Sequence, residues 1–569
     1  MKDKVIELIE KSLIEGGSKV KTEEIKKYLE IPKDINLGDF AFPCFFLAKD
    51  LKQSPNEIAI EIRKNIGNPP EEFEDIQTSG PYVNFFIDKK ALAKNLLSQI
   101  KKEKEKFGAI LTKPKDKKTI LVEFPSPNTN KPLHLGHLRN MAIGESISRI
   151  AEFNGLKVIR ANLNNDRGIH ICQSMAAYEK YGEGKTPEKL KKKSDHFVGD
   201  YYVLFNEKSK KDKDLEVLSH RMLQKYEEGD KKVLSLWKKM NKWALEGFDE
   251  TYKRFGIKHD KIYYESKIFQ KGKEIILGGV KKGVFEKKED GSIFIDLGKK
   301  LGEKILLRSD GTSVYITQDI YLAKLRFEEY NLENLIYVVG NEQEYHFEVL
   351  FKILEILGIG SKSKMKHLSY GMVNLPEGRM KSREGTVVDA DDLIKTVQDI
   401  AIKELEKRAK LSKKELRERS LAISLSAIKY LLLKIDAKKN MMFNPKESIN
   451  FEGDTGPYIQ YSYARASSIL SKSKKSPSFV PKKLGEKEKA LVRKISDFPD
   501  IVEKSYHSLN PSIIASYAYS LAQLFNEFYH ESPVIGSDSE EFRIALVEGF
   551  KQVLGNALFL LGIDVLEEM

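Results

Sequence analysis

Apolar and polar positions alternate differently in three parts of the chain. The first hundred residues combine a helix-like segment at 5–9 with strand-like alternation at 82–87, which indicates a small α+β domain. The charged, proline-containing stretch 101–118 is too polar to pack, so we expect a linker there. The first domain is therefore predicted to span residues 1–110.

The middle of the chain has the pattern of a parallel sheet. An apolar run at 119–124 predicts a buried strand, followed by a turn rich in Pro and Asn and a helix over about 137–153. Further strands are predicted at 157–162, 335–339 and 367–373. This β-α-β order indicates a doubly wound, Rossmann-type sheet, whose ligand site should lie at the carboxyl ends of the strands.

Helical patterns complete the predicted architecture. Residues from about 175 to 290 are mainly helical and charged, as expected of an insertion into the sheet domain. Five apolar residues from Leu421 to Ile435 share one helical stripe, which predicts a helical C-terminal domain. The expected fold is multidomain α/β, with an N-terminal α+β domain at 1–110, a parallel-sheet domain with a helical insertion at 111–410, and an all-α helical bundle at 411–569.

Composition narrows the class of protein. Of 569 residues 41% are hydrophobic, enough for several cores, and 97 Lys+Arg exceed 84 Asp+Glu to give a net charge of +13. A polyanionic partner and a merely lysine-rich proteome explain this charge equally well. The chain has neither a signal-peptide pattern nor an apolar run near the roughly 18 residues of a membrane span, so we expect a cytoplasmic protein with no membrane partner.

Two imidazoles, His134 and His137, stand in the turn after the first sheet strand, at the start of a helix. A zinc site is disfavoured because neither a His-Glu-x-x-His pattern nor a third ligand accompanies them, and ordinary core or surface histidines are the alternative. Both side chains could instead donate to phosphate oxygens at the positive end of the helix, while Gly136 lets an adenine ring approach. This arrangement indicates nucleotidyl transfer.

A second segment, 378–387, directly follows a predicted strand in the other half of the sheet. It concentrates Arg379, Lys381 and Arg383 with a hydroxyl and two glycines, a composition suited to a loop that clamps polyphosphate. Lysine and arginine are common in loops, so this segment alone is a weak signal. Combined with the histidine turn, on opposite halves of one sheet, it indicates an ATP site.

These two motifs resemble the HIGH and KMSKS signatures of class I aminoacyl-tRNA synthetases, and the chain is most similar to the arginyl-tRNA synthetase family. The resemblance covers nearly the whole chain, including 38–41, 80–85, 123–128, 339–347 and 456–465. It implies an arginine–tRNA ligase that uses ATP with Mg²⁺ to form arginyl-adenylate and then charges the 3′-terminal adenosine of tRNA(Arg). L-arginine, ATP and tRNA(Arg) are the implied partners, and we expect a monomer without a metal held by the protein itself.

The resemblance also implies roles for individual residues. The catalytic residues would be His134 and His137 on the α-phosphate and Lys131, Arg379, Lys381 and Arg383 on the departing pyrophosphate. ATP would be bound by His134, Gly136, His137, Met380, Lys381 and Ser382, and arginine by Glu123, Ser126, Asn128, His137, Tyr315, Asp319 and Gln343. Asn84 would contact the tRNA elbow, and Tyr458, Tyr461 and Arg465 the anticodon. Core packing is an equally good interpretation of either tyrosine.

The arginine pocket also has support from chemistry. A buried guanidinium needs a carboxylate and a further acceptor, and Tyr315 and Asp319 lie one helical turn apart on one face. An ordinary helix with a partly exposed acid is the alternative. Arginyl enzymes of this family generally need bound tRNA before they form adenylate, which we therefore expect here.

Two positions depart from the family pattern. The lysines of the second signature are displaced, and Lys131 matches a lysine that many arginyl enzymes carry just before the histidines. Arg167 stands where the family often has tryptophan, which puts the local packing in doubt. Another class I synthetase, a small nucleotidyltransferase and a non-catalytic tRNA-binding relative are the alternatives for the whole chain.

Overall fold

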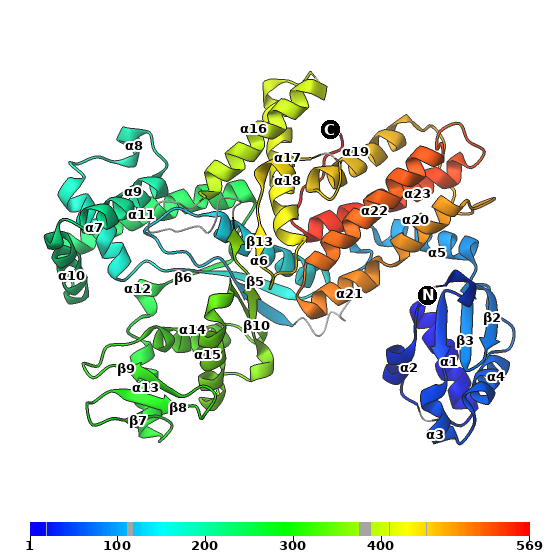
Figure 1. Cartoon of the computed structure of the whole chain (residues 1–569), viewed down its shortest axis with the longest axis horizontal. Helices are drawn as coiled ribbons and strands as arrows, with labels where there is room; N and C mark the ends of the chain where they lie inside the picture. Colours follow the sequence, from blue (N-terminus) through cyan, green and yellow to red (C-terminus); the bar gives the residue numbers. More distant parts are fainter. Residues whose placement is uncertain (19, 33, 111–117, 375–387, 409, 451) are drawn as a thin grey trace. The chain divides into compact units, whose positions relative to one another are not determined.

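The computed structural model describes residues 1–569 except 19, 33, 111–117, 375–387, 409 and 451 (Figure 1). The chain forms two compact units, each built from several segments. The first unit comprises Met1–Lys104, Ile469–Ser496 and Leu524–Gln552, and the second comprises Glu105–Ser468, Asp497–Gln523 and Val553–Met569.

The N-terminal part of the first unit is an α+β fold, as predicted. Its antiparallel sheet has the order β1-β3-β2, formed by β1 (Phe40–Pro43), β2 (Phe73–Ser79) and β3 (Tyr82–Ile87). The helices are α1 (Lys2–Glu15), α2 (Thr22–Tyr28), α3 (Ala48–Leu51), α4 (Pro55–Ile66) and α5 (Lys89–Glu103). Helix α4 begins at a capping box of Ser54 and Glu57, with Pro55 in its first position, and packs on the sheet and on α1.

The second unit contains the predicted parallel sheet. Its five strands have the order β11-β10-β4-β5-β6, and every neighbouring pair is parallel. They are β4 (Thr119–Glu123), β5 (Lys157–Asn164), β6 (Lys261–Tyr264), β10 (Leu332–Gly340) and β11 (Met365–Tyr370). The chain leaves β4 through α6 (Leu135–Phe153) toward β5, whereas β10 lies on the other side of β4. The strand order therefore reverses beside β4, where an open α/β sheet binds its ligand.

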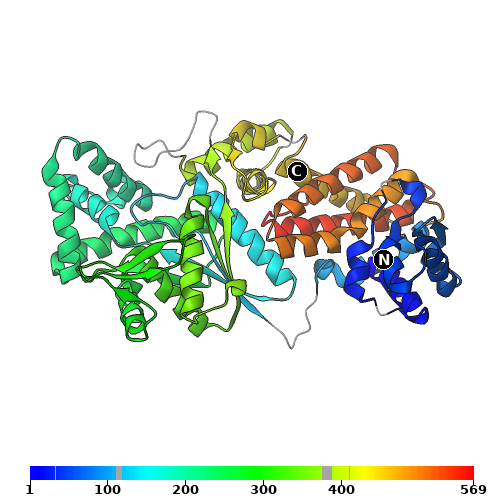
Figure 2. The same ribbon diagram turned by 60° about the horizontal axis from the view of Figure 1, so that its bottom comes forward.

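The predicted helical insertion was wrong at one point, because it contains a strand of the main sheet, β6. Residues 175–290 were expected to be helical, but Lys261–Tyr264 form the edge strand of the main sheet. Four residues that pair on one side only are too short for a periodic signal. The helices are α7 (Ile169–Tyr181), α8 (Pro187–Leu190), α9 (Ser194–Lys208), α10 (Lys213–Glu228), α11 (Lys231–Phe255), α12 (Glu265–Ile268) and α13 (Gly272–Lys281). Helices α7, α9, α10 and α11 gather in one group around a shared apolar core (Figure 2).

A small antiparallel sheet was not predicted. Strands β7 (Glu286–Lys287), β8 (Ile293–Asp296) and β9 (Glu303–Leu307) pair in order and precede α14 (Tyr315–Glu329). Helix α15 (Glu344–Ile356) follows β10 after the short turn η5 (Asn341–Gln343). The predicted strand 367–373 ends at Tyr370, and Val373–Asn374 form a separate strand, β12, beside β13 (Met441–Met442).

The C-terminal part of the chain is helical, as predicted. Its helices are α16 (Ala390–Arg408), α17 (Lys413–Leu433), α18 (Pro445–Ser448), α19 (Gly456–Lys472), α20 (Glu486–Ser496), α21 (Phe498–Ser508), α22 (Ser512–Glu531) and α23 (Glu540–Leu560). Helix α17 begins at a capping box of Ser412 and Glu415. Across the described residues, every helix is too short or too polar to cross a bilayer.

Candidate active site

The histidine turn closes the N-terminus of α6, at the point where the strand order reverses. His134 is the N-cap residue: its Nδ1 accepts a hydrogen bond from the Gly136 N–H at 3.1 Å. The His134 N–H in turn donates to His137 Nδ1, also at 3.1 Å, and the two ring centroids are 3.9 Å apart. Two backbone N–H groups that α6 cannot satisfy itself are thus paired with imidazole nitrogens.

These contacts define the state of both rings. Burial, with the positive charge of Lys131, lowers the pKa of His134 to about 3. Burial also holds the pKa of His137 well below its usual value, with His134 and Lys131 adding to the effect. Because each Nδ1 is an acceptor, a neutral ring carries its proton on Nε2. The turn therefore presents two Nε2–H donors, together with the positive end of the α6 dipole, to an anion.

The close packing of His134 explains why residue 136 is a glycine. A Cβ at this position would lie 3.0 Å from both Cε1 and Nδ1 of His134. A side chain would therefore press on the imidazole and break the cap. The predicted approach of adenine to Gly136 stays a prediction.

The segment after the second signature is bonded to the histidine turn. The Leu135 N–H donates to Val388 O, and the Ala390 N–H donates to Leu133 O, both at 3.0 Å, so His134 and Asp389 form an antiparallel bridge. The predicted site residues Arg379, Met380, Lys381, Ser382 and Arg383 lie outside the described residues. Their roles stay predictions.

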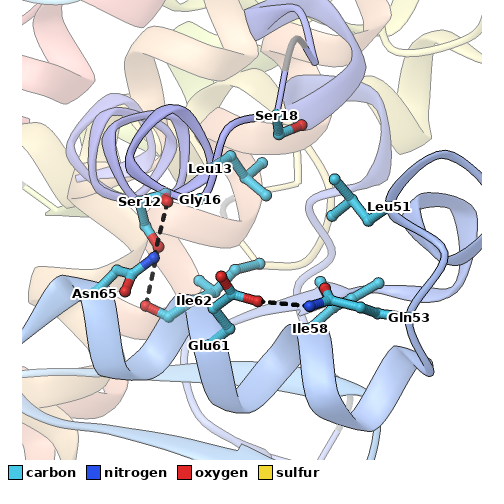
Figure 3. A pocket seen from close by; sticks show the side chains of 10 residues that line it. All are labelled: Ser12, Leu13, Gly16, Ser18, Leu51, Gln53, Ile58, Glu61, Ile62 and Asn65. Atoms are coloured by element: carbon cyan, nitrogen blue, oxygen red, sulfur yellow. Dashed lines mark hydrogen bonds between the residues drawn. The ribbon is translucent and has the colours of Figure 1, made fainter.

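Lys131 lines a cavity of about 200 Å³ beside the histidine turn. His134 and Asp389 line the same cavity, and helix α9 contributes His196 and Tyr202. The cavity is large enough for part of a substrate. By contrast, the cleft between α1 and α4 in the first unit measures about 20 Å³ (Figure 3). Asn65 there donates to Ser12 O, and the volume suits a single water molecule.

The predicted guanidinium-binding pair stands at the start of α14. Tyr315 is 75% exposed, and Asp319 follows one turn later with a half-buried carboxylate. His346 on α15 lies with Nε2 2.7 Å from Asp319 Oδ2 and so fixes the carboxylate. Gln343 is exposed in η5, after the carboxyl end of β10. Tyr315 and Gln343 are therefore accessible to a ligand.

Glu123 has a different partner from the predicted one. At the end of β4 its carboxylate forms an ion pair with the fully buried guanidinium of Arg326. Nε and Nη1 of Arg326 have no hydrogen-bond partner, so Glu123 is its charge partner. The carboxylate of Glu123 is thus already paired with an arginine of the chain itself. A direct contact of Glu123 with substrate arginine stays a prediction.

Ser126 and Asn128 line the turn between β4 and α6. Ser126 has a left-handed backbone with φ of 55°, and its hydroxyl accepts from the Leu163 N–H at 3.2 Å. Asn128 is exposed beside Asn165, which follows β5. Ser126 is thereby fixed to β5, while the Asn128 side chain is available.

Sequence reasoning missed one acid, Glu265. It begins α12 directly after β6 and is only 6% exposed. Its charged neighbours are the Arg167 cation and the Asp166 and Asp319 carboxylates, and it interacts with the Gln318 side chain. Burial raises the pKa of Glu265 to about 7. Glu265 was missed because β6 was not recognised as a strand. An acid at the carboxyl end of a strand of the parallel sheet would have been a candidate ligand-binding residue.

The departure at Arg167 is resolved by packing. Its guanidinium stacks 3.8 Å above the Phe269 ring and forms an ion pair with Glu227. A planar cation thus packs on an aromatic face at the position where the family often has tryptophan.

The predicted tRNA contacts differ in exposure. Asn84, on the central strand β3, is only 4% exposed. Tyr458, Tyr461 and Arg465 are half-buried on α19, and the Arg465 guanidinium lies 4.9 Å from the Tyr461 ring centroid. All four assignments stay predictions, and Asn84 must become accessible before it can contact RNA.

The parallel sheet, the histidine cap at the N-terminus of α6 and the helical C-terminal region agree with the fold expected of a class I aminoacyl-tRNA synthetase. The class I (R) tRNA synthetase catalytic-domain model matches residues 96–445, the arginyl tRNA synthetase N-terminal domain model residues 3–87, and the DALR anticodon binding domain model residues 459–569. The chain belongs to the arginyl-tRNA synthetase family.

Individual relatives agree with this membership. An arginine–tRNA ligase of Treponema denticola is 48% identical, with 98% of this chain and 96% of the relative covered. One from Porphyromonas gingivalis is 43% identical, with 94% of each chain covered. The solved structure of Thermus thermophilus arginyl-tRNA synthetase matches with a TM-score of 0.81 at 26% identity, over 100% of both chains.

Proposed function

We propose that this arginine–tRNA ligase activates L-arginine with MgATP at the histidine turn and transfers the arginyl group to the terminal adenosine of tRNA(Arg). In the first step an arginine carboxylate oxygen attacks the α-phosphorus, and pyrophosphate leaves. In the second step a ribose hydroxyl of the tRNA attacks the arginyl carbonyl carbon, and AMP leaves. No protein nucleophile takes part, and Mg²⁺ arrives with ATP.

The observation that carries this proposal is the capping geometry of His134 and His137, in which both Nδ1 atoms accept hydrogen bonds from backbone N–H groups. Two Nε2–H donors fixed by the backbone can stabilise charge that develops on the α-phosphate without reorganising. The resemblance supplies the cationic residues for the pyrophosphate, Lys131 from the described part of the chain and Lys381 from the second signature. Catalysis here consists of positioning and electrostatic stabilisation.

Specificity for arginine is assigned to the acids near α14. Asp319 is held by His346, and Glu265 interacts with the charge of Asp319, so two carboxylates serve one guanidinium. A neutral or shorter amino acid would leave these acids unpaired, which is a strong basis for rejection.

Further assignments follow the resemblance. We propose that the N-terminal domain binds the tRNA elbow and that the α19 face with Tyr458, Tyr461 and Arg465 stacks and pairs with unpaired anticodon bases. We also propose a cytoplasmic monomer, which light scattering coupled to size-exclusion chromatography tests.

The central experiment is aminoacylation of total tRNA with each of the 20 amino acids. We expect charging with arginine alone, and efficient charging with another amino acid would overturn the proposal.

Asp319→Asn tests the pocket within the same assay. Replacing a charge-assisted pair by a neutral contact removes about 1.5–3 kcal/mol, so the KM for arginine should rise at least about tenfold while the KM for ATP stays unchanged. Glu348→Gln is the matched control. Glu348 lies on α15, and its substitution removes an exposed ion pair with Lys300, so both KM values should stay unchanged. Equal arginine KM values for Asp319→Asn and wild type would exclude Asp319 from the pocket.

A further inference from the structure

Asp389, just before α16, and Asp391, in the first turn of α16, are carboxylates with partners in the helical insertion. Asp389 Oδ2 lies 3.1 Å from His196 Nε2 on α9, at ion-pair distance but without hydrogen-bond geometry. Asp391 Oδ2 lies 2.9 Å from the Nζ atom of Lys193 and accepts from the Thr251 hydroxyl at 2.7 Å. Arg254 on α11 adds a third cation, 3.5 Å from Asp391 Oδ1. Side chains of α9, of its N-cap residue Lys193 and of α11 therefore converge on Asp389 and Asp391.

The chain neighbours of these two carboxylates are bonded to the histidine turn. The Val388 carbonyl and the Ala390 N–H pair with Leu135 and Leu133, on either side of His134. Because these bonds are antiparallel and flank the N-cap residue, movement of this segment would move the backbone that orients the His134 ring. The carboxylates are thus one residue away from the backbone contacts of a catalytic group.

The charges of this cluster are nearly balanced. Asp195, Asp389 and Asp391 face Lys193, Arg254 and His196, and Lys193 bridges Asp195 and Asp391 at 2.9 Å each. Burial opposes the charge on His196, yet the contact with Asp389 raises its pKa overall. His196, Asp389 and Asp391 are also the one group among the described residues with the spacing of a metal site. Lys193 and Arg254 already supply positive charge to Asp391, so the cluster needs no metal ion.

We propose that this cluster is a positioning device for the first reaction step, in which Asp389 and Asp391, held by His196, Lys193 and Arg254, fix the segment from Val388 to Asp391 and through it His134. His196 and Asp389 line the cavity beside the histidine turn, whereas Asp391, Lys193 and Arg254 lie outside its lining and act through the segment alone. The inference rests on the proposed function, since His134 must act on the α-phosphate for its orientation to affect the rate.

The structure offers a direct readout of the held segment. The Leu135 and Ala390 amides donate the two bonds between this segment and the histidine turn, so their hydrogen exchange reports how firmly the segment is held. Asp391→Asn keeps the shape of the side chain and leaves Lys193 paired with Asp195. Asp391→Glu restores the charge, and Asp212→Asn removes a different carboxylate of the insertion, one paired with Lys180.

We expect Asp391→Asn to exchange both amides about tenfold faster and to lower kcat for arginylation about tenfold, a factor typical of a lost charge-assisted hydrogen bond. The KM values for ATP and arginine should change by less than about twofold, because the substrates are not contacted. His196→Gln should act in the same direction, Asp391→Glu should recover most of kcat, and Asp212→Asn should behave as wild type.

Three results would overturn the proposal: unchanged amide exchange in Asp391→Asn, faster exchange with an unchanged kcat, or an equal loss of kcat in Asp212→Asn. Thermal denaturation of each variant separates a local effect from unfolding, since a local effect leaves the midpoint near that of wild type. A wild-type enzyme that does not charge tRNA with arginine would instead overturn the proposed function, and the exchange data would still report whether the cluster holds the segment.

Discussion

At the scale of single residues, the site depends on groups whose charge is set by their neighbours. His134 and His137 are neutral because burial and Lys131 both oppose their protonation. Lys131 therefore has two effects, keeping the imidazoles in their donor state and placing a positive charge on the wall of the adjoining cavity. Both effects grow in importance as negative charge develops on the phosphates.

Lys131→Ala should accordingly lower kcat more than it raises the KM for ATP, because the contact with pyrophosphate strengthens in the transition state. Single-turnover adenylate formation with saturating tRNA and arginine measures this. Lys192→Ala, at an exposed lysine of the insertion paired with Asp200, is the control. A kcat close to that of wild type would transfer the role to Lys381 or to an arginine of the second signature.

Glu265 should make arginine affinity depend on pH. Its pKa in the folded protein is raised to about 7 by burial, so the carboxyl is neutral below this pH and charged above it. The KM for arginine should therefore fall as the pH rises from about 6 to 8, as the pocket gains a negative charge beside Asp319.

Glu265→Gln removes this titration, so its KM for arginine should be higher at pH 8 and nearly constant over the same range. A wild-type KM without pH dependence would contradict the assignment of Glu265 to the pocket.

At the scale of elements, α6 connects the site to the sheet. Arg139 donates to the carbonyls of Gly371 and Lys439, and Asn140 donates to Val338 O in β10. Further along the helix, Ser146 donates to Leu560 O. These contacts fix the direction of the helix, and with it the position of the histidine cap at its N-terminus.

Gly144→Ala tests how closely α6 packs on the sheet. A Cβ there would lie 2.4 Å from Cγ of the fully buried Phe124, so the side chain or the helix must shift. Overpacking of this kind costs about 1–3 kcal/mol, more than the ~1 kcal/mol by which Ala is the better helix former.

Urea denaturation should thus show a lower free energy of unfolding for Gly144→Ala. Gly278→Ala in α13 is the matched control, since no atom lies within 4 Å of its added Cβ, and it should leave stability unchanged or raise it by up to ~1 kcal/mol. Destabilisation of equal size in both variants would argue against a steric origin.

At the scale of the whole molecule, the family resemblance predicts that adenylate formation requires bound tRNA. ATP–pyrophosphate exchange with arginine should be nearly silent for the protein alone and should appear when tRNA(Arg) is added. A tRNA for another amino acid is the control and should not restore exchange. Robust exchange without tRNA would separate this chain from the family at this point.

The sequence alone was sufficient for the main architecture, although it missed the edge strand β6 and the small β7-β8-β9 sheet. Strands β4, β5 and β10 and helix α6 are long and strongly apolar on their buried faces, so their periodicity located them and implied a parallel sheet. The histidine turn was found for a related reason: its chemistry lies within four consecutive residues, and short-range motifs do not need tertiary contacts to be recognised.

Only the tertiary structure decided which charges meet. Glu123 and Arg326 are separated by 203 positions. Glu265 is brought near Asp319 because it directly follows β6, and a strand of four residues leaves no periodic pattern in the sequence. Asp389 and Asp391 acquire their partners from helices that precede them by more than 100 residues. Ion pairs and pKa shifts depend on distance and burial, and the packing of distant segments sets both, so local sequence patterns could not supply them.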